Sequence, residues 1–222
     1  MNETRNTKVK KVVLYGDSIR IGYEEYIKRS LEGIAEVYHP DDNCRFAEYL
    51  LRYAHVWKEK GEWPDDVDAV HWNAGLWDCL ELFEDGPLTS YDYYRETVAR
   101  IDRRLRLLYP KAKIIFATST AVVEEEYSPD QRRRNAVIER FNAEAIEALR
   151  GTDTEINDLY AITKDCPRDL HSDKTHFYTD GGVALVGGQV LSVLSRALGV
   201  ECRGVDTTGF CRPKYSKETI GF

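Results

Sequence analysis

Short β-rich segments alternate with amphipathic segments along almost the whole chain, and this alternation constrains the fold more than any other feature. Residues 11–15 (KVVLY) end at a glycine, which is typical of a buried strand that runs into a loop. Further strands are predicted at 35–39, 68–73, 112–118 and 154–159. We expect these strands to pair in parallel, because each crossover helix returns the chain to the same edge of the sheet.

The segments between the strands show helical periodicity. From 90 to 108, Tyr94, Val98 and Ile101 recur at intervals of three and four residues, which places them on one helix face. The same spacing predicts helices at 22–33, 44–60, 131–149 and 180–198. About five parallel strands with helices on both faces make a three-layer α/β/α sandwich, in which ligands bind beyond the carboxyl ends of the strands.

The composition argues against several classes of partner. The 222 residues carry a formal net charge of −7, whereas nucleic-acid binding depends on clustered Lys and Arg side chains. The longest basic clusters, Arg103-Arg104 and residues 132–134, fall in helical patterns and are interpreted as solvated helix faces or helix beginnings. We therefore expect no nucleic-acid partner.

The termini and the cysteines indicate neither a membrane nor a metal. The N-terminal MNETRNTKVKK lacks the apolar core of a signal peptide, and no apolar run approaches the ~18 residues that span a bilayer. A cytoplasmic location without a membrane partner is therefore predicted, whereas the sequence does not indicate an oligomeric state. The five cysteines form no CxxC pair, so free thiols are expected, and only Cys202 and Cys211 lie in one segment that an oxidising setting could join.

The first strand runs into Gly16-Asp17-Ser18-Ile19. The glycine allows a sharp turn, and Ser18 then lies near the start of a helix, where free backbone N–H groups can stabilise an oxyanion. Gly-Asp-Ser is also ordinary turn and helix-capping chemistry, and by itself the tripeptide favours that structural interpretation. The stretch is neither a G-x-S-x-G elbow, since position 20 is Arg, nor a phosphate-binding glycine loop.

The third predicted strand runs into HWNAGLWDC, residues 71–79. Asn73, Gly75 and Asp78 supply an amide donor, a flexible backbone and a carboxylate at the same edge of the sheet. Helix capping by Asp78 is the structural alternative. Trp72 and Trp77 are interpreted as core or rim aromatic residues rather than as a dedicated substrate platform.

The stretch DLHSDKTHFYTDGG, residues 169–182, precedes the last predicted helix. A histidine that acts as a base needs a carboxylate to hold its tautomer, and Asp173 lies three residues before His176. His171 is a competing candidate, with Asp169 or Asp173 nearby. Thr179 or Asp180 is expected to cap the helix that follows.

Together, GDS, NAGLWD and DKTHFYTDGG resemble the motifs of the SGNH, or GDSL-type, hydrolases, in an order that covers nearly the whole chain. The resemblance implies a flavodoxin-like sandwich and a serine esterase or acylhydrolase that needs no metal or other cofactor. At the matching positions Ser18 would be the nucleophile, His176 the base and Asp173 its partner. Gly16 and Asp17 would shape the nucleophile loop.

Two positions depart from the family pattern where the oxyanion hole is expected. Cys44 lies where the family has a glycine after the second strand, although its backbone N–H can still donate a hydrogen bond. Trp77 occupies the asparagine position of the family's G-x-N-D motif, which begins here at Gly75 and ends at Asp78. Either Asn43 or Asn73 is then expected to supply the amide.

The resemblance divides the chain into a polar extension (1–10), a hydrolase-like domain (11–199) and a C-terminal tail (200–222). The expected substrate is a small-molecule ester with a small acyl group, such as acetyl on a carbohydrate, because aromatic and polar residues are expected at the site edge. These are Trp72, Trp77, Arg45, Tyr127 and Tyr178. The alternatives are an acylhydrolase of the lysophospholipase or thioesterase type and a non-catalytic carbohydrate-binding module on the same fold.

Overall fold

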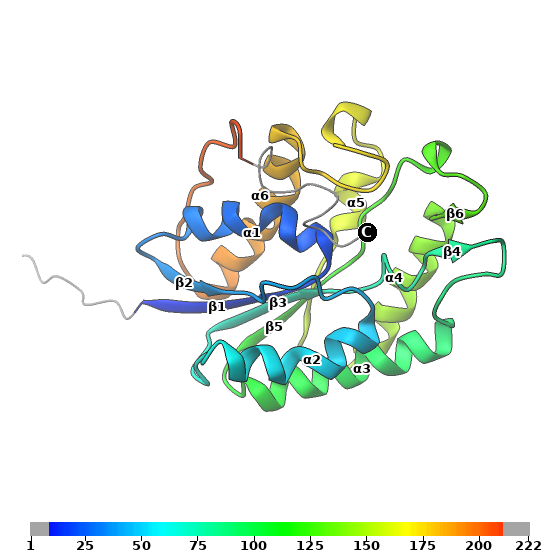
Figure 1. The fold of residues 1–222 in the computed structure, drawn as a ribbon. Helices are drawn as coiled ribbons and strands as arrows, with labels where there is room; N and C mark the ends of the chain where they lie inside the picture. Colours follow the sequence, from blue (N-terminus) through cyan, green and yellow to red (C-terminus); the bar gives the residue numbers. More distant parts are fainter. Residues whose placement is uncertain (1–8, 211–222) are drawn as a thin grey trace, which may run out of the picture.

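A five-stranded parallel sheet forms the centre of the computed structural model, which describes residues 9–210 (Figure 1). Its strands lie in the order β2-β1-β3-β5-β7. They are β1 (Lys10–Tyr15), β2 (Ala35–Tyr38), β3 (Ala69–Asn73), β5 (Lys113–Ala117) and β7 (Glu155–Asn157). Tyr15 lies opposite Trp72, and Asn73 lies opposite Ala117, so β1, β3 and β5 reach their carboxyl ends at nearly the same level. The loops that follow these strands therefore meet at one edge of the sheet.

Helices cover both faces of the sheet (Figure 1). On one face lie α1 (Ser18–Ser30) and α6 (Asp180–Leu198), which pack against each other, with the short helix α5 (Leu159–Thr163) beside α6. On the other face α3 (Tyr91–Leu108) packs between α2 (Ala47–Lys60) and α4 (Asn135–Leu149). The predicted three-layer α/β/α sandwich is confirmed.

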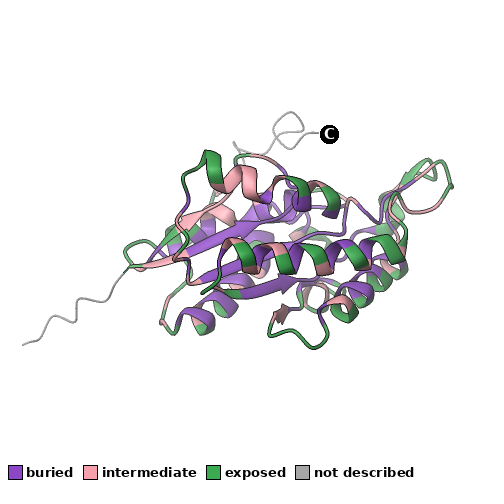
Figure 2. Ribbon diagram, turned by 90° about the horizontal axis from the view of Figure 1, so that it is seen from below, coloured by how far each residue is buried: buried purple, intermediate pink, exposed green. Residues whose placement is uncertain are grey.

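The core lies between the two helix layers and includes the buried central strands of the sheet (Figure 2). Residues 12–15 of β1 are fully buried, because both faces of this strand are covered. Trp72 on β3 and Phe116 on β5 pack edge to face, with their ring centroids 4.7 Å apart. Trp72 is therefore a core aromatic residue and not part of a substrate platform.

The predicted helix at 131–149 begins later, at Asn135. Its first residues instead form β6 (Gln131–Arg132), which pairs antiparallel with β4 (Glu81–Leu82) beyond the carboxyl edge of the sheet. Arg132 and Arg134 both form ion pairs with Glu81. Arg133 is 5% exposed, so 132–134 is not a solvated helix face, whereas the alternative of a helix beginning holds for Arg134, the N-cap residue of α4.

Two further boundaries shift for identifiable reasons. The predicted strand at 154–159 ends at Asn157, because the Asp158 side chain accepts a hydrogen bond from the Ala161 N–H and starts α5. The predicted helix at 22–33 already begins at Ser18, where Asp17 provides the cap. Local side-chain capping, which periodicity does not register, sets both ends.

Helix α6 is long and apolar enough to cross a membrane by length and composition. The expectation that no segment has this property therefore fails for one of the described helices. Over half of its apolar window, 56%, is buried inside the structure, against α1 and the sheet. Burial in the protein accounts for its apolar character, as it does for core helices in general.

The described part of the C-terminal tail, residues 200–210, runs back over α1 and α6. The Val205 N–H donates to Ser30 Oγ at 3.3 Å, and the Gly209 N–H donates to Asp180 Oδ1 at 3.1 Å. Arg29 lies over the Phe210 ring at 4.6 Å. At the other end, Lys10 is the first residue of β1 rather than the last of an extension. The four described cysteines are free thiols, and Cys211 lies outside the described residues.

Two leucines on α3, one buried and one exposed, test how much core packing contributes to the free energy of unfolding. Leu105 is fully buried and Leu107 is 78% exposed. We expect Leu105→Ala to lower the free energy of unfolding by about 2–5 kcal/mol, because it leaves a cavity in the core, and Leu107→Ala to change it by less than about 0.5 kcal/mol. Urea denaturation measures both values. Equal losses in the two variants would contradict the packing of α3 described above.

Candidate active site

The first loop of the site joins β1 to α1 and places Ser18 at the first residue of the helix. The Asp17 side chain caps α1 by accepting a hydrogen bond from the Ile19 N–H at 3.0 Å. The same oxygen, Oδ1, accepts a second hydrogen bond from Asn73 Nδ2 at 2.9 Å. A side chain at Gly16 would overlap the Asn73 amide, so only glycine allows this approach. The capping chemistry of Gly-Asp-Ser is thus present, and it also fixes the position of Ser18.

The third loop brings a histidine and a carboxylate to Ser18. His176 Nε2 lies 2.8 Å from Ser18 Oγ, and His176 Nδ1 lies 2.8 Å from Asp173 Oδ2. The other Asp173 oxygen accepts the backbone N–H groups of Thr175, at 2.6 Å, and His176, at 2.9 Å. These bonds place serine, imidazole and carboxylate in one continuous chain, with partners 158 residues apart in the sequence.

The electrostatic environment keeps Asp173 ionised. Burial alone would raise its pKa, but the hydrogen bond and charge of His176 and the two backbone N–H groups outweigh burial and hold the pKa well below its ordinary value. An ionised carboxylate favours the tautomer in which Nδ1 carries the proton. His176 Nε2 is then free to accept the proton of Ser18 Oγ.

The competing histidine, His171, faces other groups. Its Nε2 lies 3.5 Å from Cys166 Sγ, and its ring packs against Phe177 with the centroids 4.0 Å apart. Burial and the charge of Arg168 lower its pKa, which favours the neutral imidazole. The structure therefore places His176, and not His171, on the serine. Thr179, rather than Asp180, caps α6 by accepting the Gly182 N–H at 3.0 Å.

The second loop contributes a buried carboxylate with a structural role. Asp78 accepts the Ala47 N–H at 3.0 Å and the Thr89 hydroxyl at 3.0 Å. Phe46, the residue at the N-cap position of α2, makes no side-chain hydrogen bond to the helix. Asp78 therefore caps α2 from a neighbouring loop. Burial raises the pKa of Asp78 to about 7. The helix-capping alternative for this residue is thus realised, on a helix other than its own.

The expected backbone donor at Cys44 is already engaged. Its N–H donates to the Gly16 carbonyl at 3.1 Å, and the Gly16 N–H donates back to Cys44 Sγ at 3.3 Å. This pair of bonds joins the loop after β2 to the loop of Ser18, so the Cys44 N–H, which the sequence offered as a possible oxyanion donor, is bonded to Gly16 instead. Asn43 Oδ1 accepts the Arg45 N–H at 2.9 Å, in a tight turn where Arg45 has a positive φ of 46°.

The remaining candidate donors differ in position. Asn73 Nδ2 donates to Asp17 beside Ser18, and this amide nitrogen carries a second N–H. Trp77 is half-buried at the rim, where it packs edge to face on Phe46 with the centroids 5.5 Å apart. Gly75 has a φ of 136°, and a side chain there would lie 2.5 Å from Ser119 Oγ, so this glycine serves the backbone turn.

Sequence reasoning missed two buried arginines that tie the site loops together. Arg20 forms an ion pair with Glu24 and donates to the carbonyls of Pro40, at 3.1 Å, and Asp42, at 2.5 Å. Arg133 donates to the Leu76 carbonyl and, at 3.4 Å, to the Tyr127 hydroxyl. Both contacts link backbone segments far apart in sequence, so the only sequence signal was the basic residue itself.

Among residues 9–210, no three His, Cys, Asp or Glu side chains gather closely enough to hold a metal ion. The groups in line with the Ser18 hydroxyl are the His176 imidazole and the Asp173 carboxylate. Chemically, this arrangement can activate a hydroxyl group for attack on a carbonyl carbon.

Solved structures with the same architecture identify the fold. A lipase/acylhydrolase from Enterococcus faecalis superposes with a TM-score of 0.66 and 19% identity, over 89% of this chain and 99% of that chain. A GDSL-like lipase from Bacteroides thetaiotaomicron gives 0.64 and 15%, over 85% and 89% of the two chains. The chain has the SGNH, or GDSL-type, hydrolase fold.

An acetylxylan esterase from Geobacillus stearothermophilus shares the GDSL-type fold with a TM-score of 0.63 and 16% identity, over 86% of this chain and 95% of that chain. The sequence matches no protein-family model and no curated protein. The likeness in the GDSL-type fold therefore rests on three-dimensional structure, at identities where side chains have largely diverged.

The ionisation of Asp78 predicts that the free energy of unfolding depends on pH. The folded-state pKa of Asp78, about 7, exceeds the ordinary value, so the folded protein holds this proton more tightly than the unfolded chain does. The free energy of unfolding should consequently fall as the pH rises from about 4 to about 7. In Asp78→Asn, which keeps an acceptor for the Ala47 N–H but does not ionise, this fall should be smaller. Urea denaturation at several pH values measures it.

Asp78→Ala is the matched control, because it removes the cap altogether. Like Asp78→Asn, this variant should show the flatter pH dependence, and it should be less stable than Asp78→Asn by about 1 kcal/mol at every pH in that range. An Asp78→Asn protein with the same slope as the wild type would show that Asp78 does not carry the effect.

Proposed function

We propose that the chain is a serine hydrolase of carboxylic esters in which Ser18 is the nucleophile, His176 the general base and Asp173 its partner. The hydrogen-bond chain from Ser18 Oγ through His176 to Asp173 carries this proposal. The GDSL-type fold supports it, because esterases and acylhydrolases are among the solved structures with this fold.

The reaction follows from the direction of the hydrogen bonds. His176 Nε2 accepts the Ser18 proton while Oγ attacks the ester carbonyl carbon, and Asp173 stabilises the imidazolium that forms. The imidazolium then gives its proton to the leaving alcohol, which leaves an acyl group on Ser18. Water that gives a proton to His176 attacks this acyl-enzyme, the bond between the acyl carbon and Oγ breaks, and the imidazolium returns the proton to Ser18 Oγ as the acid leaves.

The negative oxygen formed on the carbonyl needs N–H donors already in place. The Ser18 N–H lies at the first residue of α1, where a helix leaves its backbone N–H groups without an intrahelical acceptor. Asn73, whose amide nitrogen is held beside the nucleophile by Asp17, is the side-chain donor that we assign to the oxyanion. With Asn73 in this role, no oxyanion donor is required from Trp77, which occupies the family's asparagine position.

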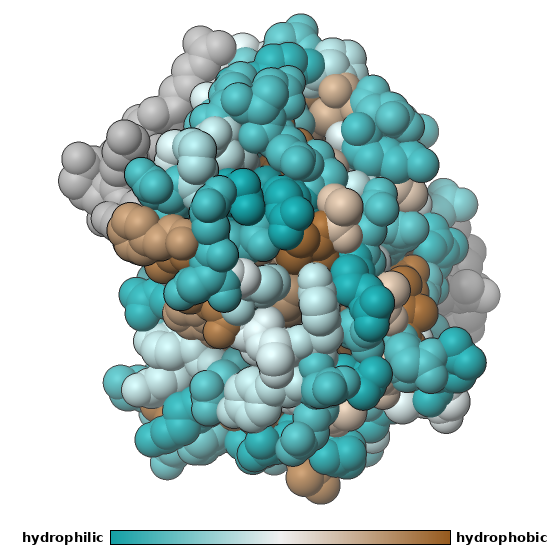
Figure 3. Space-filling view, turned by 90° about the vertical axis from the view of Figure 1, so that its right-hand side faces the viewer, coloured by the Kyte–Doolittle hydropathy of each residue, from teal (hydrophilic) through white to brown (hydrophobic). Residues whose placement is uncertain are grey.

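A small acyl group on a polar alcohol is the substrate that we assign, with acetyl on a carbohydrate as the first candidate. Figure 3 faces the carboxyl edge of the sheet, where hydrophilic and near-neutral side chains dominate and apolar patches are separate from one another. Such a surface suits a sugar better than a long acyl chain. Several solved structures of similar fold are acetyl xylan esterases by their descriptions.

Replacement of the nucleophile tests the mechanism. Ser18→Ala removes the attacking oxygen, so hydrolysis of p-nitrophenyl acetate should fall by at least about 1,000-fold. Labelling of the wild type by a fluorophosphonate should occur at Ser18 and be absent in the variant. Unchanged turnover in Ser18→Ala would exclude the mechanism, and an unlabelled, folded wild type would favour a non-catalytic binding module.

The two histidines of the third loop provide a matched comparison. His176→Ala should approach the loss seen in Ser18→Ala, whereas His171→Ala should be much milder, because His171 has no contact with the serine in the described structure. The reverse order of effects would assign the base to His171. Circular dichroism of both variants controls for loss of the fold.

The acyl preference is tested with p-nitrophenyl esters of increasing chain length. We expect kcat/KM to be highest for acetate and to fall with each pair of added carbons, because the apolar patches that residues 9–210 present at this edge are separate from one another. A maximum at eight carbons or more would contradict this assignment and favour a lysophospholipase or thioesterase type of activity.

A further inference from the structure

Tyr178, two residues beyond the base, touches both partners of the Ser18–His176 pair. Its hydroxyl donates to the backbone carbonyl of Ser18 at 2.5 Å. Its ring stacks on the imidazole of His176, with the centroids 4.7 Å apart and the planes at 24°. A single side chain thus contacts the backbone that presents the nucleophile and the flat face of the base.

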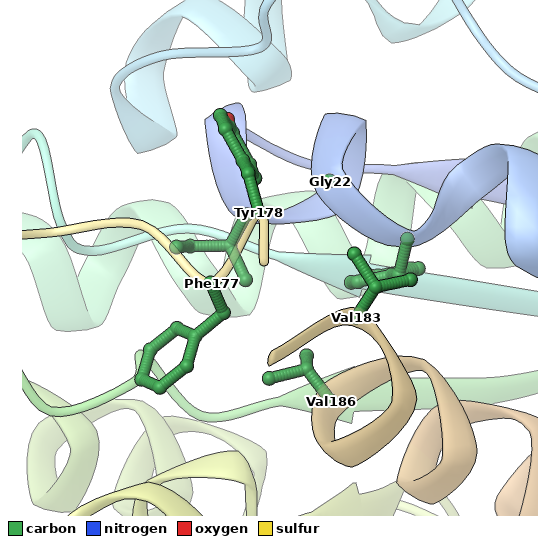
Figure 4. Close-up of a pocket in the computed structure, with 7 residues that line it drawn as sticks. Gly22, Phe177, Tyr178, Val183 and Val186 are labelled. Carbon is green, nitrogen blue, oxygen red and sulfur yellow. The ribbon is translucent and has the colours of Figure 1, made fainter. Parts of the chain in front are cut away.

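Helix α1 makes room for this ring at Gly22. A side chain there would lie 2.5 Å from Tyr178 Cε1 and 2.7 Å from Cδ1, and the three nearest heavy atoms all belong to Tyr178. Figure 4 shows Tyr178 beside the first turns of α1 near Gly22, whereas the ring of Phe177 projects to the opposite side. The absence of a side chain at Gly22 is therefore what lets Tyr178 approach the helix.

Packing does not fill the space around the ring completely. A cavity of about 10 Å³ lies between α1 and α6, lined by Tyr178, Gly22, Ile19, Tyr23, Phe177, Val183 and Val186. Its volume is at the lower limit for one water molecule, so it is no substrate pocket. The ring is held by its stack on His176, by its approach to Gly22 and by the hydrogen bond of its hydroxyl to the Ser18 carbonyl.

Tyr178 is 8% exposed, which does not suit the substrate contact expected at the site edge. We propose instead that Tyr178 is a positioning residue, which clamps the Ser18 backbone to the His176 ring, with Gly22 as the space that the clamp requires. This inference rests on the proposed function for its kinetic consequences, but the clamp itself is a structural statement. Its effect is to hold Nε2 in line with Oγ, where a misplacement of about 1 Å can cost on the order of 100-fold in rate.

The clamp predicts graded effects for the two parts of the side chain. Tyr178→Phe removes only the hydroxyl and should lower kcat for p-nitrophenyl acetate about 10-fold, which corresponds to the loss of one hydrogen bond. Tyr178→Leu also removes the ring and should lower kcat about 100-fold. KM should change little in both, because Tyr178 does not contact the substrate. Tyr93→Phe, at an exposed tyrosine bonded to Glu48, is the matched control and should leave kcat unchanged.

Gly22→Ala perturbs the same contact from the opposite side. In the wild-type background the added methyl group displaces the ring, so kcat should fall about 10-fold or more. In the Tyr178→Leu background the added methyl group meets a smaller side chain, so the double variant should be no slower than Tyr178→Leu alone. Gly188→Ala, in α6 with nothing within 4 Å of an added methyl group, is the matched control.

A readout that does not depend on turnover separates this proposal from the proposed function. The Nδ1 proton of His176, held by Asp173, should give a low-field NMR signal in the wild type and in Tyr178→Phe. In Tyr178→Leu the signal should broaden or vanish, because the imidazole ring of His176 is held less firmly. The thermal midpoint of the variant shows whether the protein remains folded.

Each result then has one meaning. Loss of the low-field signal in Tyr178→Leu, together with an inactive wild type, would sustain the clamp and reject the esterase. If the wild type is active, and both Tyr178→Leu and Gly22→Ala keep its kcat and its low-field signal, the clamp is rejected. The proposed esterase function would then still stand. Additive losses in the double variant would also overturn the clamp, because Gly22 and Tyr178 would then act separately.

Discussion

The rest of the site depends on the hydrogen bonds that the buried carboxylate of Asp17 accepts. This carboxylate caps α1 through the Ile19 N–H and accepts the amide of Asn73, so one side chain joins the ends of β1 and β3. Burial raises the pKa of Asp17, which means that its ionised form is costly and has to be balanced by these donors. Because Asp17 immediately precedes Ser18, any movement of the carboxylate would move the serine.

Asp17, Asp78 and Asp173 lie one in each of the three motif loops of the site, and their environments give these carboxylates different tasks. Burial dominates at Asp17 and Asp78, where it raises the pKa, and these two groups hold backbone together. At Asp173 the imidazole and two backbone N–H groups outweigh burial and lower the pKa. Only the third carboxylate is therefore suited to stabilise a positive charge on His176 during a reaction.

The site loops are tied to one another by buried cations and by aromatic contacts rather than by regular structure. Arg20 holds the loop after β2 against α1, and Arg133 holds the loop after β3 against Tyr127. Tyr127 in turn lies 2.6 Å from the Thr175 hydroxyl, next to the base. These links explain how loops, which are ordinarily the mobile part of a fold, can hold reactive groups at hydrogen-bond distance.

The sequence by itself determined the sandwich and the positions of Ser18, Asp173 and His176 at its carboxyl edge, because hydrophobic periodicity and three short motifs are local patterns. It left His171 open as an alternative, gave Asp78 two interpretations and left the Cys44 N–H open as an oxyanion donor. Only the tertiary structure decided these points, since each depends on a partner distant in sequence: Ser18 for His176, the α2 terminus for Asp78 and the Gly16 carbonyl for Cys44. Tyr178 and Gly22 were beyond sequence reasoning for the same reason, because a stacked ring and the space that admits it exist only once α1 and the third loop have packed together.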